Sequence, residues 1–140
     1  MLGFLALLGA LWMAPACETG FCSCVGPRGV PSSAASADAV FTGRVVRVRN
    51  VMNGGRQMRR VTLRVDRAWK GVDARTVVVM TGSGGGDCGF PFRRRQSYLV
   101  YANGPPGEVL GVGICGRTAE VSRAAADLRE LGQPSRRWPD

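Results

Sequence analysis

The chain has 140 residues, of which 45% are hydrophobic and 21% charged, so it is long enough for one domain with its own core and too apolar for general disorder. Its formal net charge is +9, and it contains no histidine, which removes the usual general base and the commonest metal ligand. Asp38, Asp66 and Asp87 are widely spaced, and a turn, a cap or a solvated strand face explains each of them. We therefore expect a protein that is not an enzyme and has no metal or cofactor of its own.

The N-terminus carries an apolar run, Leu2–Met13, which is too short to cross a bilayer at about 20 residues per span. It is followed by Ala14-Pro15-Ala16, with the small residues that signal peptidase requires before its cleavage site. We predict that residues 1–16 are a signal peptide and that the protein is exported to the medium, the periplasm or the cell envelope. The alternative is a short apolar helix, because no Lys or Arg precedes the run.

Five cysteines follow this leader, and in an oxidising compartment cysteines usually pair. Five is an odd number, so at least one is left over. The candidate is Cys17, directly after the predicted cleavage site. Three alternatives stay open for it: a lipid attachment that makes the protein a lipoprotein, a free thiol, or an intermolecular bridge.

Residues 17–36 are rich in Gly, Pro, Ser and Cys and show no periodicity, which predicts an extended leader with a short turn at Ser33–Ala37. A strand is expected from Ala39 to Val51, where valines and arginines interleave. The adjacent Val45-Val46 interrupts the alternation and indicates a β-bulge or strong coiling of the strand. Asn53-Gly54-Gly55 then supplies residues that tolerate positive φ and favours a hairpin.

Four more strands and a helix are expected after this hairpin turn. Residues 60–66 alternate between apolar and charged side chains, which is typical of a half-buried strand. The glycine-rich residues 82–86 lack the Gly-Lys-Ser/Thr of a phosphate loop and suit close packing around a disulfide. A period of three to four residues predicts a helix over 121–131, with Ser122 as its cap and Gly132 as its end. The other three strands are expected at Val77–Met80, Tyr98–Tyr101 and Val109–Ile114.

Five strands followed by one helix predict a mainly β fold. Among small barrels, the five-stranded Greek-key barrel of the OB-fold type, with the C-terminal helix packed against it, fits this order best. The barrel and helix are expected over residues 37–132, and residues 133–140 are expected to form a polar tail. Closure of the barrel removes sheet edges that would otherwise promote aggregation.

Several short motifs, in order, resemble the N-terminal domain of the tissue inhibitors of metalloproteinases (TIMPs) and the wider netrin-like module. The resemblance runs from Cys22 to about Leu131. None of the motifs is specific alone, but the ordered set is fairly specific. They are Cys22-Ser23-Cys24, Ala37-Asp38-Ala39-Val40-Phe41, Trp69-Lys70-Gly71, Asp87-Cys88-Gly89 and Ile114-Cys115.

This resemblance implies disulfides from Cys22 to Cys88 and from Cys24 to Cys115. It also implies that Cys22, Ser23 and Cys24 form an inhibitory segment, flanked by the loop of Asp87, Cys88 and Gly89. In the family, the α-amino nitrogen and carbonyl oxygen of the first cysteine chelate the catalytic zinc of a metalloendopeptidase. The partner implied is therefore a zinc metalloendopeptidase.

The sequence departs from the family at the start of the mature chain. Cleavage after Ala16 leaves five residues, Cys17–Phe21, in front of Cys22, whose nitrogen is then an amide and a negligible zinc ligand. Inhibition by the family mechanism therefore requires a second trimming step.

The excess of arginine has two explanations, which the sequence leaves open. One is the codon bias of a GC-rich genome. The other is a binding module without inhibitory activity, whose basic face binds anionic glycan, lipid or an acidic protein. The candidates are Arg93, Arg94 and Arg95, together with Arg59-Arg60 and Arg136-Arg137. Because an exported protein meets anionic polysaccharide or the envelope surface first, no nucleic acid partner is expected.

Overall fold

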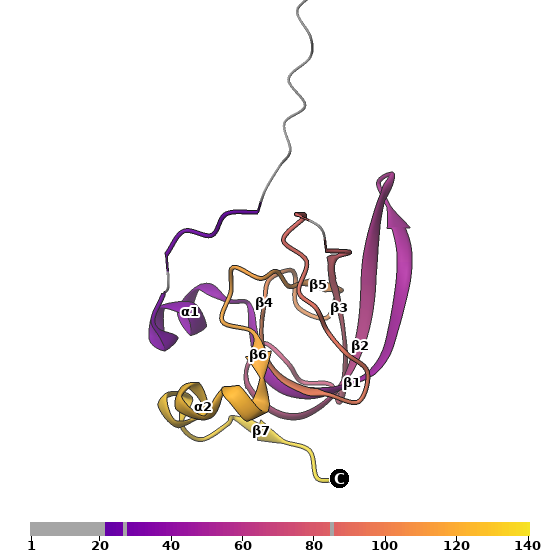
Figure 1. Ribbon diagram of the computed structural model, residues 1–140. Helices are drawn as coiled ribbons and strands as arrows, with labels where there is room; N and C mark the ends of the chain where they lie inside the picture. Colours follow the sequence, from indigo (N-terminus) through magenta and orange to yellow (C-terminus); the bar gives the residue numbers. More distant parts are fainter. Residues whose placement is uncertain (1–21, 27, 85) are drawn as a thin grey trace, which may run out of the picture.

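The computed structural model describes residues 22–26, 28–84 and 86–140 (Figure 1). The predicted signal peptide, residues 1–16, and Cys17 lie outside these residues. Within the part of the chain that is described, no helix is long and apolar enough to cross a membrane.

The described residues form a mainly β fold with one seven-stranded sheet and two α-helices. The strands follow the order β5-β3-β2-β1-β4-β6 across the sheet, and β7 pairs with β2. The elements are α1 (Val30–Ser36), β1 (Ala39–Asn53), β2 (Arg56–Lys70), β3 (Thr76–Gly82), β4 (Ser97–Ala102), β5 (Leu110–Gly111), β6 (Ala119–Glu120), the 3₁₀ turn η1 (Val121–Arg123), α2 (Ala125–Leu131) and β7 (Arg136–Arg137).

The hairpin of β1 and β2 is the longest feature of the sheet and agrees with the sequence prediction. Asn53 pairs with Arg56 across the two-residue turn Gly54-Gly55, whose φ angles are +56° and +77°. These positive angles match the right-handed twist of the strands. The register also shifts between Val45 and Arg47, which confirms the predicted bulge. In Figure 1 the end of this hairpin projects beyond the rest of the sheet.

The sequence predicts five strands, and the described part of the chain has seven. The expected strand Val109–Ile114 pairs as β5 over only two residues, parallel to β3. Isolated bridges at Gly111 and Gly113 replace a continuous ladder there. The other two, β6 and β7, are two residues long each and carry no periodicity that a sequence pattern could reveal.

Three predicted segments have a different form. The turn expected at Ser33–Ala37 belongs to α1, so the end of the extended leader is helical. The helix expected over residues 121–131 is interrupted at Ala124, and Ser122 does not cap it, although it ends at Gly132 as predicted. The expected polar tail contains β7, and the backbone N–H of Trp138 donates to the Asp66 carbonyl at 2.9 Å while the Trp138 ring packs on the core.

Two hydrophobic clusters lie on opposite faces of the sheet. The larger contains Phe41, Leu63 and Tyr98 on the inner face, together with Phe92 from the loop before β4. The smaller lies on the outer face, where α1 and α2 pack over Val40 and its neighbours on β4. The helices therefore cover only one end of the outer face.

The Trp69-Lys70-Gly71 motif ties the end of β2 to both helices. The Trp69 indole N–H donates to the Gly132 carbonyl at 2.9 Å, and Lys70 Nζ donates to the carbonyls of Ala34 and Ala35 at the end of α1. Gly71 has a φ of +68°, and a Cβ there would overlap the Asp38 carbonyl oxygen. Each residue of the motif thus has a separate structural role.

Candidate functional site

Two disulfides hold the segment Cys22–Cys24 against two loops, the one between β3 and β4 and the one between β5 and β6. Cys22 is bonded to Cys88 and Cys24 to Cys115, with Cα–Cα distances of 5.2 and 5.1 Å. This pairing confirms the one implied by the TIMP resemblance. Disulfides of this kind are typical of proteins from oxidising, extracellular-type compartments.

The two disulfides lie against each other. Cys22 Sγ is 3.9 Å from Cys115 Sγ, and these two sulfurs and that of Cys88 all lie within 4.8 Å of one another. All three sulfurs are bonded in disulfides, so none is a thiolate available to a metal. The Ile114 N–H also donates to the Cys88 carbonyl at 3.0 Å. The segments around Cys88 and Cys115 are therefore joined to each other and together hold Cys22–Cys24, and we call these two segments the support.

The loop of Asp87, Cys88 and Gly89 is organised by the Asp87 carboxylate. This carboxylate accepts hydrogen bonds from the N–H groups of Ser83, Gly84 and Gly89 at 2.7 to 3.0 Å. Desolvation raises the pKa of Asp87, but these N–H donors outweigh it and hold the pKa below its ordinary value. The Asp87 carboxylate thus orders the loop whose Cys88 is bonded to Cys22.

Glycine is required at position 89 for steric reasons. A Cβ there would overlap the backbone carbonyl of Gly82, at the end of β3. The close approach brings Cys88 to the edge of the sheet, where it bonds Cys22. The sequence indicated close packing for the glycines of residues 82–86, and Gly82 is such a case, since a Cβ there would overlap the Asp87 carboxylate.

The held segment is exposed, and a cleft lies beside it. Ser23 and Cys24 are exposed, and Val25 is 90% exposed. The cleft has a volume of about 750 Å³ and is bordered by Ser23, Cys24, α1 and the start of α2. A partner protein could therefore reach both Ser23 and the cleft from the same side.

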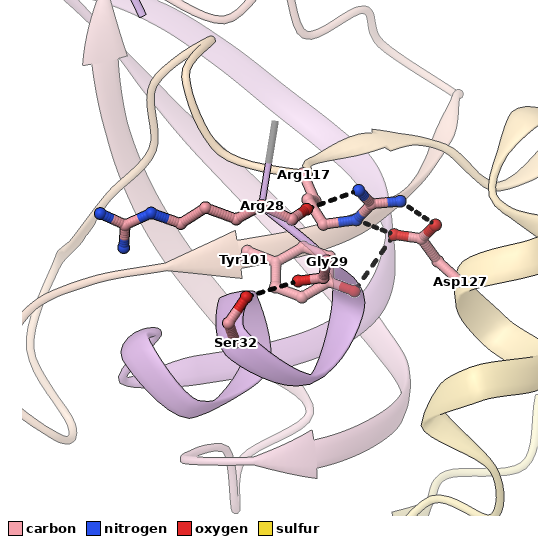
Figure 2. A network of polar contacts seen from close by, with 6 residues as sticks. All are labelled: Arg28, Gly29, Ser32, Tyr101, Arg117 and Asp127. Carbon is pink, nitrogen blue, oxygen red and sulfur yellow. Dashed lines mark hydrogen bonds and ion pairs between the residues drawn. The ribbon is translucent and has the colours of Figure 1, made fainter. Parts of the chain in front are cut away.

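Arg117 and Asp127, which the sequence did not single out, form an ion pair that lines this cleft (Figure 2). Arg117 donates to both carboxylate oxygens of Asp127 at 2.6 and 2.8 Å, and to the Arg28 carbonyl at 2.8 Å. The Tyr101 hydroxyl donates to the same carboxylate at 3.3 Å. The network ties α2 and β4 to the chain that leads from the held segment into α1.

The network also sets the ionisation of its members. The hydrogen bond from Arg117 holds the pKa of Asp127 below its ordinary value, although burial opposes this. Burial and the neighbouring Asp127 charge raise the pKa of Tyr101 to about 12. One signal for this pair is present in the sequence: Asp127 follows Ala124 by three residues and so lies on the inward face of α2, where an acid needs a buried partner.

The arginine triplet lies elsewhere. Arg93, Arg94 and Arg95 are exposed in the loop before β4, and the Arg95 N–H donates to the Val45 carbonyl of β1 at 2.9 Å. The triplet thus borders the bulge of β1 and forms no part of the Cys22–Cys24 support.

No protein-family model matches this chain, and no curated protein matches it. The proposed function therefore rests on the geometry of the held segment and on the sequence resemblance.

Proposed function

We propose that this protein is a secreted, TIMP-like inhibitor of a zinc metalloendopeptidase, acting through Cys22, Ser23 and Cys24. The observation that carries the proposal is the pair of adjacent disulfides that hold this short exposed segment against one support. Holding the segment in one conformation lowers the entropy lost when it enters a protease active site.

The chemistry requires a free α-amino group on Cys22. A catalytic zinc keeps one coordination position open for water or substrate. A neutral amine and the neighbouring carbonyl oxygen can occupy this region and displace the water that attacks the substrate. The pKa of an α-amine is near 8, so a useful neutral fraction exists at neutral pH.

The fold proposed for this inhibitor is an OB-fold-like barrel. Support comes from the pairing of the longer strands: β1 pairs with β2 and β4, and β3 pairs with β2 and, in parallel, with β5. An isolated bridge between Asn103 and Gly111 joins the end of β4 to β5. These contacts would close a five-stranded barrel, with β6 and β7 as short additions.

Inhibition is tested with two versions of the disulfide-bonded protein, one beginning at Cys22 and one with a single alanine in front of Cys22. We expect the first to inhibit at least one of a panel of zinc endopeptidases, and the second to be at least about 100-fold weaker because its nitrogen is an amide. Inhibition by the first version should strengthen as the pH rises from 6 to 8, since the amine loses its proton.

The matched control carries one alanine at the C-terminus, after Asp140, and should inhibit like the version that begins at Cys22. Equal inhibition by the two N-terminal versions would show that the α-amine is not the zinc ligand. Absence of inhibition across the panel by the version that begins at Cys22 would contradict the proposed function itself.

A further inference from the structure

Arginines gather on the outer face of the β1–β2 hairpin. Val45 faces Leu63 and Val48 faces Val61 on the inner side, so the pairs that alternate with the inner ones along the hairpin project outward. All six arginines that these outward pairs contribute are exposed: Arg44, Arg47 and Arg49 of β1, and Arg56, Arg60 and Arg64 of β2. We call this set the arginine face.

The bulge in β1 is responsible for this arrangement. Arg44 and Arg47 are three residues apart, so in a regular strand they would point to opposite faces. The register shift between Val45 and Arg47 inserts one residue and places both arginines on the outer side. The same interruption therefore aligns the charges of β1 with those of β2.

The arginine face brings like charges together. Arg44 is directly opposite Arg64, and Arg49 is directly opposite Arg60. Side chains in such positions have Cβ atoms about 5 Å apart, and like charges there destabilise a sheet. Among the described residues, the ion pairs are Arg67 with Asp66 and Arg117 with Asp127, and neither includes an arginine of this face.

Two neighbouring features define the limits of the face. At one end, Asp66 accepts a hydrogen bond from Thr42 at 2.6 Å, and beyond it α1 and α2 cover the sheet. Along β1, the exposed triplet of Arg93, Arg94 and Arg95 borders the bulge. Figure 1 shows the hairpin on a different side of the molecule from the Cys22–Gly26 segment.

We propose that the arginine face binds a linear anionic polysaccharide carrying sulfate or carboxylate groups. The face is long and narrow: the eight residue-to-residue steps from Arg56 to Arg64 span about 26 Å of strand. A chain of regularly spaced anions laid along the hairpin would relieve the repulsion within both opposed arginine pairs. This binding surface goes beyond the proposed inhibitory function and does not depend on it.

Two features favour polysaccharide over the other polyanions. The outward positions between Arg44 and Asn53 of β1 and between Arg56 and Arg64 of β2 carry no aromatic residue on which bases could stack, unlike proteins that bind single-stranded nucleic acid. Met52, the large exposed apolar side chain near the tip, pairs with Gln57 on the opposite side from the arginines, so it would not enter a membrane that the arginines contact. The disulfides also place the protein where anionic glycans are common.

The test compares two triple variants that lose the same charge. R49Q/R60Q/R64Q removes half of the arginine face, and R28Q/R123Q/R129Q removes three exposed arginines elsewhere. We expect the first to weaken binding to heparin and to alginate about tenfold or more at 0.15 M salt, and the second by less than about threefold. The dependence of log affinity on log salt should become shallower for the first variant, because fewer anions are neutralised.

A second measurement separates loss of binding from loss of folding. The thermal midpoint of R49Q/R60Q/R64Q at low salt should equal or exceed that of the unaltered protein, because repulsion between opposed arginines is removed. Equal weakening by both triple variants, or unchanged binding by the first, would overturn the proposal. So would an unaltered protein that binds phosphatidylglycerol vesicles or DNA but neither polysaccharide.

Discussion

Replacing Cys24 and Cys115 together by serine is expected to lower the free energy of unfolding by about 4 kcal/mol. The bridge joins residues 91 apart in the sequence, and a bond that closes so long a loop removes much conformational entropy from the unfolded chain. Urea unfolding of C24S/C115S, followed by the fluorescence of the tryptophans, measures the change.

Two companion variants make this result specific. C22S/C88S opens a loop of similar length, with 66 residues of separation, and should cost about the same, about 4 kcal/mol. Ser23→Ala changes only the exposed residue between the two bonded cysteines and should leave the unfolding free energy within about 0.5 kcal/mol. A loss below about 1 kcal/mol for either double variant would mean that the corresponding bond contributes little to stability.

Gly71→Ala is expected to destabilise the protein by about 3 kcal/mol or more. A residue with a side chain at the φ of +68° costs about 1 to 2 kcal/mol by itself. In addition, the new Cβ would overlap the Asp38 carbonyl oxygen, and backbone must move to accommodate it. Because Asp38 directly precedes β1, the displacement would reach the central strand of the sheet.

Gly107→Ala is the matched control for this substitution. Gly107 has a similar φ of +77°, but a Cβ there would have no neighbour within 4 Å. It should therefore cost only the backbone term, about 1 to 2 kcal/mol. Equal losses from the two variants in thermal or urea unfolding would show that the contact between Gly71 and Asp38 is unimportant.

The parts of the fold that the sequence predicts are those with strong local patterns. Alternating side chains over residues 60–66 locate the middle of β2, and the Asn-Gly-Gly turn locates the end of the hairpin. The adjacent valines at 45 and 46 locate the bulge. The two disulfides follow from the TIMP resemblance, because residue spacing alone does not choose a pairing among five cysteines.

The remaining features depend on contacts between distant segments. Neither β6 nor β7 has a pattern of its own, since each is two residues long and forms only where a neighbouring strand is available. The Arg117–Asp127 pair depends on how α2 packs over β4, which a sequence pattern does not give. The arginine face depends on strand register, so the sequence pointed to runs of adjacent arginines, of which only Arg60 belongs to the face.

The central claim is that a free α-amine on Cys22 acts on the zinc of a metalloendopeptidase. It is tested most directly by N-terminal sequencing, together with the intact mass, of the unreduced protein recovered outside the cells that produce it. We predict a chain that begins at Cys22, with both disulfides intact. A chain that begins at Cys17 and keeps the five residues before Cys22 would contradict the proposed mechanism.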